Sequence, residues 1–156
     1  MRRADREIKD INELKEIVHQ ADVCRIGFAV DNRPYIVPMN YGYKWEGNQL
    51  ILYFHCAGEG KKMELMKKNN IVCFEMDIDR ELIRDNISCK WGMRYRSIIG
   101  LGALNEVMDL EEKEFALNNI MSHYGFVGKS DYDEKILNKT KILRLNVTEI
   151  TGKKQG

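Results

Sequence analysis

The chain reads MRYRSIIGLGALNEVM from Met93 to Met108, and this segment decides the fold that we expect. It is rich in residues that favour β-structure and is much longer than the usual strand of about five or six residues. Gly100 and Gly102 lie within it, and glycines inside a strand indicate bending or the close approach of another backbone. A long bent strand of this kind is typical of a β-barrel.

Shorter strand patterns flank this segment on both sides. Apolar side chains occupy every second position of residues 24–30, whereas residues 49–55 are apolar on both faces. Pro38 lies within the pattern of residues 35–43, and because proline cannot donate to a strand ladder it predicts an edge or a bulge there. Residues 78–90 read as a polar connection. The expected strands are residues 24–30, 35–43, 49–55, 71–77, 93–108 and 143–148.

Helices are indicated where an aspartate is followed three residues later by a glutamate, a capping pattern. Asp10 with Glu13 and Asp109 with Glu112 form this pattern, and apolar residues follow each pair at helical spacing. A third, short helix is expected at residues 61–68. Helices and strands do not alternate regularly, so a doubly wound parallel sheet is not expected. The sequence therefore predicts a mainly β fold, an antiparallel barrel or sandwich of about six strands with appended helices.

The composition is that of one ordinary globular domain spanning residues 1–156. Hydrophobic residues make up 44% of the chain and charged residues 31%, which excludes a mainly disordered or collagen-like protein. The 25 basic and 24 acidic residues leave a net charge of +1. The overall charge therefore gives no reason to expect nucleic acid or a membrane surface as a partner.

Targeting and cysteine patterns indicate a cytoplasmic protein. Apolar stretches such as Ile51 to Phe54 are far shorter than the roughly 18 residues of a membrane span. The charges at the start of the chain are not followed by the apolar segment of a secretion signal. The four cysteines show no CxxC spacing and no short Cys/His pair, which argues against a zinc site. We therefore expect reduced thiols and no bound metal.

The stretch most informative about function reads YFHCAGEGKK from Tyr53 to Lys62. An apolar strand leads into His55, a glycine-containing loop follows, and Lys61 and Lys62 begin the short helix. The N–H groups of a helix N-terminus and two ammonium groups favour the same negative ligand, so the arrangement predicts a phosphate site. Its spacing is not that of a Walker A loop. The alternative is an ordinary turn with solvated lysines.

Other residues that can carry chemistry are less specific. His55 stands where a core strand opens into a loop, a position at which side chains often meet ligands, although a purely structural role is equally compatible with it. His19 and His123 have no Cys, Asp or His neighbours at metal-ligand spacing, so we expect surface or structural roles for them. Residues 91–97 mix aromatic and arginine side chains, as RNA-binding proteins do, but the balanced charge argues against nucleic acid. No pattern supports a hydrolase.

In these same stretches the chain resembles the flavin-binding split-barrel proteins related to pyridoxamine 5′-phosphate oxidase, and among them the nitroimidazole-resistance (Nim) branch. The likeness covers nearly the whole chain, and the order and spacing of the motifs carry it rather than any single motif. The motifs are Met1-Arg2-Arg3, Asp5-Arg6-Glu7-Ile8, Val37-Pro38-Met39-Asn40-Tyr41-Gly42-Tyr43, Tyr53-Phe54-His55, Gly60-Lys61-Lys62, Cys73-Phe74-Glu75, Tyr95-Arg96-Ser97-Ile98-Ile99-Gly100-Leu101-Gly102 and Ile150-Thr151-Gly152-Lys153.

The resemblance implies a six-stranded Greek-key split barrel and a homodimer with two flavin sites at the subunit interface. Lys61, Lys62 and the helix N-terminus would hold the phosphate of FMN, with Ser97 as a further donor; FAD would bring a phosphate to the same place. Tyr95 and Arg96 would come from the second subunit. One segment would run beside the isoalloxazine ring, and its backbone groups would hydrogen-bond the edge of that ring. This segment consists of Pro38, Met39, Asn40 and Tyr41.

The resemblance also implies a flavin-dependent oxidoreductase that passes electrons from reduced flavin to a small planar acceptor such as a nitroimidazole. His55 would lie near the flavin and donate a proton or orient the acceptor, since imidazole titrates near neutral pH. The arginine-containing C-terminal segment of the pyridoxamine phosphate oxidases is not matched after Gly152-Lys153, so oxidation of pyridoxamine phosphate is not expected. Two alternatives stay open: a flavin-binding storage, sensing or stress protein without turnover, and a haem-binding split-barrel protein with His55 as axial ligand.

Overall fold

The computed structural model describes residues 3–128 and 131–156. Met1 and Arg2, which begin the first motif of the resemblance, lie outside the described residues. The strands are β1 (Glu7–Ile8), β2 (Cys24–Val30), β3 (Arg33–Met39), β4 (Gly42–Glu46), β5 (Gln49–Cys56), β6 (Ile71–Ile83), β7 (Gly92–Val107) and β8 (Lys141–Gln155). The α-helices are α1 (Ile11–Gln20), α2 (Lys61–Lys68), α3 (Leu110–His123) and α4 (Glu134–Lys139), and single 3-10 turns form at Ala4–Arg6 and Ser88–Lys90.

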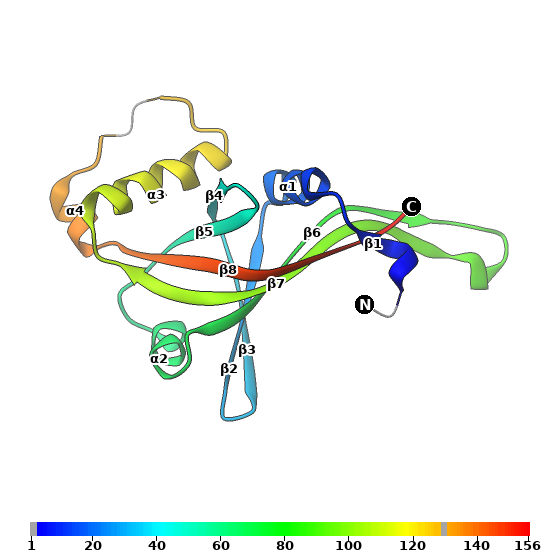
Figure 1. The fold of residues 1–156 in the computed structure, drawn as a ribbon, viewed down its shortest axis with the longest axis horizontal. Helices are drawn as coiled ribbons and strands as arrows, with labels where there is room; N and C mark the ends of the chain where they lie inside the picture. Colours follow the sequence, from blue (N-terminus) through cyan, green and yellow to red (C-terminus); the bar gives the residue numbers. More distant parts are fainter. Residues whose placement is uncertain (1–2, 129–130) are drawn as a thin grey trace.

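The strands form one antiparallel sheet that curls into a barrel. Its hydrogen-bonded order is β3-β2-β6-β7-β8-β5-β4, with β1 paired to β8 in addition. β3 and β4 stand at opposite ends of this order, yet only Asn40 and Tyr41 separate them in the chain. The two ends of the sheet must therefore meet. The β2–β3 hairpin and the far part of the β6–β7 ribbon extend from the curled region (Figure 1).

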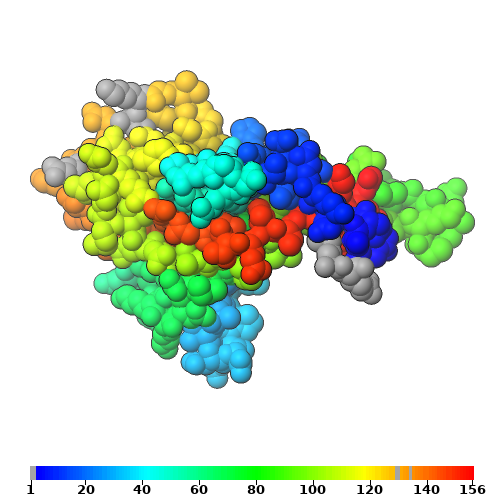
Figure 2. All heavy atoms as spheres, in the orientation of Figure 1, coloured from blue at the N-terminus to red at the C-terminus, as the bar shows by residue number. Residues whose placement is uncertain are grey.

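Apolar side chains at alternate strand positions fill the interior. Cys24, Ile26 and Phe28 of β2 are buried, as are all of residues 50–54 in β5. α1 packs against β6 and β7, α2 against β2, and α3 against β4 and β5. α1 and α2 lie on opposite sides of the strands (Figure 1). The space-filling view shows the far end of the β6–β7 ribbon projecting from the body of the molecule (Figure 2).

Both predicted capping residues are confirmed. An Oδ1 atom of Asp10 accepts a hydrogen bond from the Asn12 N–H at 2.9 Å, and that of Asp109 accepts one from the Glu112 N–H at 2.9 Å. Each aspartate satisfies a backbone donor that the first turn of its helix leaves unpaired. α1 and α3 begin one residue later. After α3, Gly125 adopts a φ of +85°, a conformation that suits glycine at a helix end.

The mainly β fold with appended helices is confirmed, but the sheet has eight strands rather than six. One additional strand, β1, has two residues, too few to form a recognisable sequence pattern. The other arises because residues 35–43 divide into β3 and β4. Pro38 does lie on an edge, since among the described strands β3 pairs with β2 alone. The break itself falls at Asn40 and Tyr41, two and three residues after Pro38, and the side chain of Tyr41 is fully buried.

The expected polar connection over residues 78–90 is wrong in its first half, because β6 continues to Ile83 and stays paired with β7. The register shifts next to Asp79, whose φ is +56°. Beyond this bulge, Glu81 accepts a hydrogen bond from Arg94 of β7 at 2.8 Å. Both faces of this ribbon meet water, so polar residues occupy it and the alternation that marks a half-buried strand is missing.

The close backbone approach expected at the glycines of β7 is present. A Cβ atom at Gly102 would overlap the carbonyl oxygen of Asn146 in β8 and lie 2.9 Å from its carbonyl carbon. We therefore expect Gly102→Ala to lower the free energy of unfolding by roughly 2 to 3 kcal/mol, because two paired strands have to separate locally. Denaturant unfolding measures this loss. Gly58→Ala is the control, since the nearest atom to a Cβ there lies 3.5 Å away on the flexible side chain of Lys141. Equal stability of the two variants would contradict the expectation.

Candidate functional site

The N-terminal end of α2 combines free backbone donors with two ammonium groups. Gly60 precedes the helix with a φ of +124°, and no side chain of the described residues caps this end. The first N–H groups of a helix have no acceptor within the helix and are available to an anion. Lys61 and Lys62 are the first two helical residues; Lys61 is exposed and Lys62 is half-buried. The helix end therefore has the arrangement that the predicted phosphate site requires.

Lys61 connects α2 to β3. Its Nζ atom lies 4.4 Å from the centre of the Tyr35 ring, a cation–π contact. β3 continues from Tyr35 through Pro38 to Met39, and Asn40 follows it directly. Pro38 and Asn40 are exposed, whereas Met39 is buried. The contact therefore places the predicted phosphate end of α2 against the strand that carries the predicted flavin-ring segment.

Tyr41, the last residue of that segment, has a structural side chain. Its ring is fully buried, and its hydroxyl lies 2.7 Å from the carbonyl oxygen of Val18 and 2.8 Å from that of Ala21. Burial raises the pKa of the Tyr41 hydroxyl well above its usual value. The hydroxyl is a donor that secures the C-terminal end of α1, and the Tyr41 N–H donates to the Tyr124 hydroxyl at 3.3 Å. Neither of these two Tyr41 donors is therefore free for a ligand.

His55 lies near the end of β5, one residue before Cys56 and beside the loop that leads to α2. Its side chain is exposed at this rim of the barrel. The pKa of His55 is lowered, first because partial burial disfavours the imidazolium ion and second because the Lys62 ammonium is near. The sequence analysis predicts that His55 and the two lysines share one site; of the two lysines, Lys62 is the one whose charge acts on His55.

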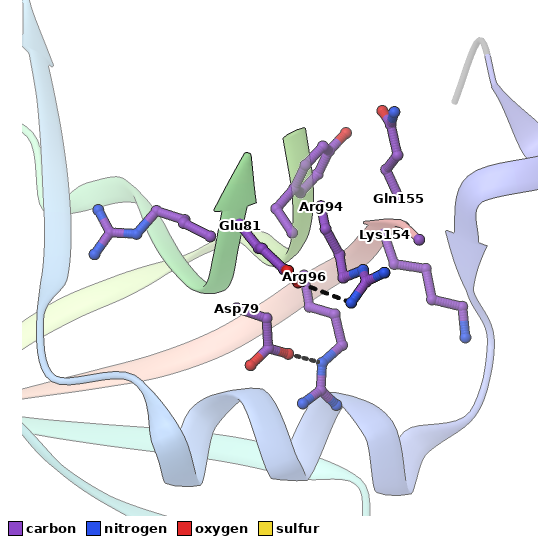
Figure 3. Close-up of a pocket in the computed structure, with 9 residues that line it drawn as sticks. Asp79, Glu81, Arg94, Arg96, Lys154 and Gln155 are labelled. Carbon is purple, nitrogen blue, oxygen red and sulfur yellow. Dashed lines mark hydrogen bonds and ion pairs between the residues drawn. The ribbon is translucent and has the colours of Figure 1, made fainter. Parts of the chain in front are cut away.

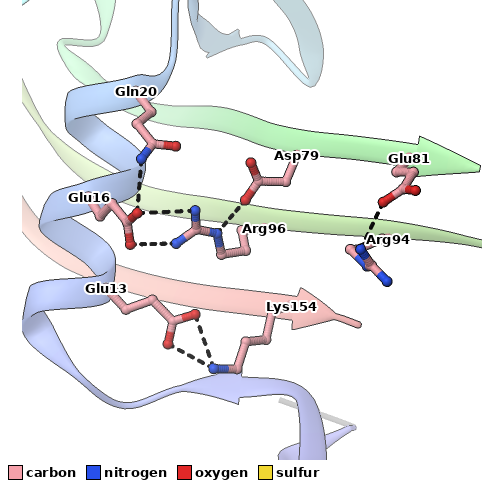
Figure 4. A network of polar contacts seen from close by, with 8 residues as sticks. All are labelled: Glu13, Glu16, Gln20, Asp79, Glu81, Arg94, Arg96 and Lys154. Atoms are coloured by element: carbon pink, nitrogen blue, oxygen red, sulfur yellow. Dashed lines mark hydrogen bonds and ion pairs between the residues drawn. The ribbon is translucent and has the colours of Figure 1, made fainter.

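The remaining predicted residues, Tyr95, Arg96 and Ser97, lie in β7 and form a separate group. Arg96 binds two carboxylates: its Nη1 lies 2.6 Å from Glu16 of α1, and its Nε lies 2.5 Å from Asp79 of β6 (Figure 4). The hydrogen bond to Glu16, and then that to Asp79, raise the pKa of Arg96. Its guanidinium is therefore already neutralised by partners within the same chain.

A depression of about 500 Å³ lies beside this second group (Figure 3). Its cations are also paired: Arg94 with Glu81 at 2.8 Å, and Lys154 with Glu13 of α1 at 2.8 Å. Tyr95 contributes an aromatic wall. The positive charges of this depression are matched by carboxylates. It is therefore a weaker candidate for phosphate binding than the N-terminal end of α2.

One chain does not bring the two groups of predicted residues together. Arg96 is bonded to α1, whereas Lys61 belongs to α2, and these helices lie on opposite sides of the strands (Figure 1). Sequence reasoning missed Tyr35, Glu16 and Asp79. Glu16 and Arg96 are 80 residues apart, and no local pattern signals a contact over such a separation. For Tyr35 there is one local signal: the side chains of β3 alternate between the two faces of the sheet, and this alternation turns Tyr35 toward the core.

The other two histidines have structural partners, as expected. The Nδ1 atom of His19 lies 2.8 Å from the Tyr43 hydroxyl, and the Nε2 atom of His123 lies 2.9 Å from the carbonyl oxygen of Ala21. His123 therefore donates from Nε2. Among residues 3–128 and 131–156, no group of three or more His, Cys, Asp or Glu side chains is arranged to hold a metal ion.

The lowered pKa values of His55 and His123 lead us to expect that the folded protein is less stable in mild acid. The pKa values of His55 and His123 are both lowered, mainly by burial, whereas in the unfolded chain each titrates near about 6.5. Below that pH the unfolded state binds more protons, so the free energy of unfolding falls as the pH is lowered. We expect chemical denaturation between pH 7 and pH 5.5 to show this slope. The slope of the unfolding free energy against pH should be shallower in a His55→Gln/His123→Gln variant. An unchanged slope would contradict its assignment to these two histidines.

A curled antiparallel sheet with appended helices defines a split-barrel fold, and the uncapped N-terminal end of α2 lies beside its edge strand β3, where it could accept the anionic group of a cofactor. The chain belongs to the pyridoxamine 5′-phosphate oxidase family, whose sequence profile matches residues 10–154. Members of this family bind flavins. None of the described helices is both long and apolar enough to cross a membrane. The cytoplasmic location and the extent of the domain stay predictions from the sequence.

Solved structures share the fold. A candidate 5-nitroimidazole antibiotic resistance protein from Bacteroides thetaiotaomicron is 33% identical, with a TM-score of 0.82 over 94% of this chain and 85% of that chain. The flavocytochrome Anf3 from Azotobacter vinelandii is 17% identical, with a TM-score of 0.83 over 100% of this chain and 72% of that chain. An FAD and haem binding protein from Mycobacterium smegmatis is 15% identical, with a TM-score of 0.78 over 97% and 74%. No curated protein sequence matches significantly. The expected fold and family are thus confirmed.

Proposed function

We propose that this protein is a flavin-dependent oxidoreductase that transfers electrons from reduced flavin to a small planar acceptor such as a nitroimidazole. The observation that carries the proposal is the N-terminal end of α2, where uncapped N–H groups and two lysines favour a phosphate. Membership of the family supports a flavin as the ligand that carries this phosphate. The 33% identical structure attributed to nitroimidazole resistance supports the choice of acceptor.

FMN is the flavin that we propose for this site. Its terminal phosphate would meet the α2 N–H groups, Lys61 and Lys62, and its ring would run along the segment from Pro38 to Tyr41. Pro38 and Asn40 are exposed, which leaves these two positions of the segment open to a ligand. FAD would present a diphosphate to the same helix end, with its adenosine half directed to solvent.

The flavin, when bound, supplies the electron transfer itself. Reduction of a nitro group to an amine takes up six electrons and six protons and releases two water molecules. Three equivalents of a two-electron donor, such as a nicotinamide nucleotide, are therefore consumed for each acceptor. His55 is the side chain that we assign to proton donation and to orientation of the acceptor, since it is exposed at the barrel rim beside Lys62.

The test begins with the absorption spectrum of the purified protein and continues with anaerobic reduction. Flavin bands are expected; a haem Soret band would contradict the proposal and favour a haem-binding role for His55. NADH or NADPH is then added without oxygen, followed by a 5-nitroimidazole. Reoxidation of the flavin by the nitro compound, with formation of the amine, is the expected result. Flavin that is reduced but never reoxidised by the acceptor would instead indicate a storage or sensing protein.

We also propose that the functional unit is a homodimer formed through the outer face of the sheet. Ile36 of β3, Ile71 of β6, and Ile99 and Leu101 of β7 are 66%, 53%, 51% and 39% exposed. The strand register places these side chains on one face, around a hollow of about 400 Å³ at Ile36. Apolar patches of this kind are typical of protein interfaces. A second copy is the occupant that we propose, because one chain leaves the two groups of site residues apart.

The dimer is tested by charge substitution on this face. We expect an Ile99→Asp/Leu101→Asp variant to become monomeric and to lose flavin, because burying two carboxylates at the interface is strongly unfavourable. Sedimentation equilibrium gives the oligomeric state, and flavin absorbance gives the occupancy. Ile136→Asp on α4 is the matched control, since Ile136 is 62% exposed outside this face. A double variant that remains dimeric would exclude this face as the interface.

A further inference from the structure

Lys61 is one of three lysines in the described part of the chain whose ammonium group lies over an aromatic ring, and its contact with Tyr35 is the shortest of the three. Arg25, Arg94, Arg96, Lys141 and Lys154 each bind a carboxylate. For Lys61, no carboxylate of the described residues lies within ion-pair distance, and its Nζ atom instead lies 4.4 Å from the centre of the Tyr35 ring. An aromatic face attracts an ammonium group without neutralising it. Lys61 is thus held in place while it keeps its full charge.

The Tyr35 ring is itself well positioned for this task. Tyr35 pairs with Phe28 across β2 and β3, and it packs, partly buried, against the main apolar core. Lys61 begins α2 directly after the left-handed Gly60. The ring and the helix start are therefore both fixed by backbone structure, and the flexible lysine stem spans the distance between them.

An ammonium group held in this way is prepared for an anion. A free lysine side chain loses roughly 1.5 to 2 kcal/mol of rotamer freedom when it is immobilised. A contact that restricts it before the ligand arrives reduces that loss, which is the usual benefit of preorganisation. The ring covers one side of the ammonium only, so N–H groups on its other side remain available to phosphate oxygens.

We propose that Tyr35 is a positioning residue that preorganises Lys61 for the flavin phosphate, and that it thereby contributes to the preference for FMN over riboflavin. This inference rests on the proposed flavin site, and it adds a residue that none of the motifs singled out. Tyr35 acts through Lys61, so its effect should depend on the phosphate and not on the ring of the ligand.

The experiment compares dissociation constants for FMN and riboflavin, measured by quenching of flavin fluorescence with the purified apoprotein. Tyr35→Leu should weaken FMN binding about threefold to tenfold and leave riboflavin binding nearly unchanged. Tyr35→Phe, which keeps the aromatic face, should bind FMN almost as wild type. In a Lys61→Met background, Tyr35→Leu should cause no further loss, because its partner is already absent.

Each other result has a distinct meaning. Equal weakening of FMN and riboflavin by Tyr35→Leu, or no weakening of either, would overturn the positioning role alone. A wild-type protein that binds riboflavin as tightly as FMN would overturn the phosphate site and this inference with it. Tyr35→Gln serves as a second ringless variant should Tyr35→Leu fold poorly, and it is expected to show the same selective loss of FMN.

Discussion

An alanine at both Lys61 and Lys62 should weaken FMN binding by about a hundredfold or more, because each charge-assisted hydrogen bond to a phosphate contributes roughly 1.5 to 3 kcal/mol. Riboflavin lacks the phosphate, so its affinity should change little. Isothermal titration of both ligands against the apoprotein measures the difference. This selective loss distinguishes a phosphate site from a general disturbance of the flavin pocket.

The same substitution should not harm the fold. Lysines at a helix N-terminus oppose the helix dipole, so removing them from α2 is expected to leave the apoprotein equally or slightly more stable. Lys67→Ala/Lys68→Ala is the matched control, since these exposed lysines occupy the last turn of the same helix. FMN affinity that is unchanged in the Lys61/Lys62 variant, or equally reduced in the control, would remove the two residues from the phosphate site.

A glutamine at His55 should lower the rate of nitro reduction by about a hundredfold, a usual contribution of a general acid. Flavin binding should persist, because His55 is not among the residues that we assign to the phosphate. Glutamine keeps a hydrogen-bonding side chain but cannot titrate. Single-turnover reoxidation of the reduced protein by a 5-nitroimidazole measures the step directly, without interference from the electron donor.

The pH profile adds a second readout for His55. Burial and Lys62 lower its pKa, so the protonated donor is present only below a pH that is itself under about 6.5. The rate should therefore fall as the pH rises through this lowered value, and the variant should lack that decline. His19→Gln is the control, since His19 is exposed on α1 and bonded to Tyr43. A variant with an unchanged rate and pH profile would exclude His55 from the chemistry.

Elements whose signals are local could be predicted from the sequence. The two aspartate caps, the alternating strand β2 and the glycine-led helix α2 all have the expected bounds to within a residue. Their determinants are hydrogen bonds and side-chain periodicities that act over a few residues. The polar half of β6 and the second half of β8 could not be predicted in this way. They are strands because each is paired with β7, a neighbour distant in sequence.

The candidate site likewise contains residues that the local sequence could indicate and residues that it could not. His55, Gly60, Lys61 and Lys62 are consecutive or nearly so, and their chemistry could be inferred from that short stretch. The partners of Arg96 could not be inferred from the sequence, because Glu16 lies on α1 and Asp79 lies in the bulge of β6. Likewise, no pattern indicated that the Tyr41 side chain would be buried under α1, with its hydroxyl on two helix carbonyls.

By itself, the sequence determined the fold class, the family and a cationic helix start suited to one phosphate, because periodicity, caps and motif order are written in neighbouring residues. Only the tertiary structure decided which of the cations are free to meet a ligand. Arg96 and Lys154 are neutralised by carboxylates of α1, whereas Lys61 rests on the ring of Tyr35 and keeps its charge. The physical reason is that charge pairing depends on distance in space, and the curling of one sheet sets those distances across the whole chain.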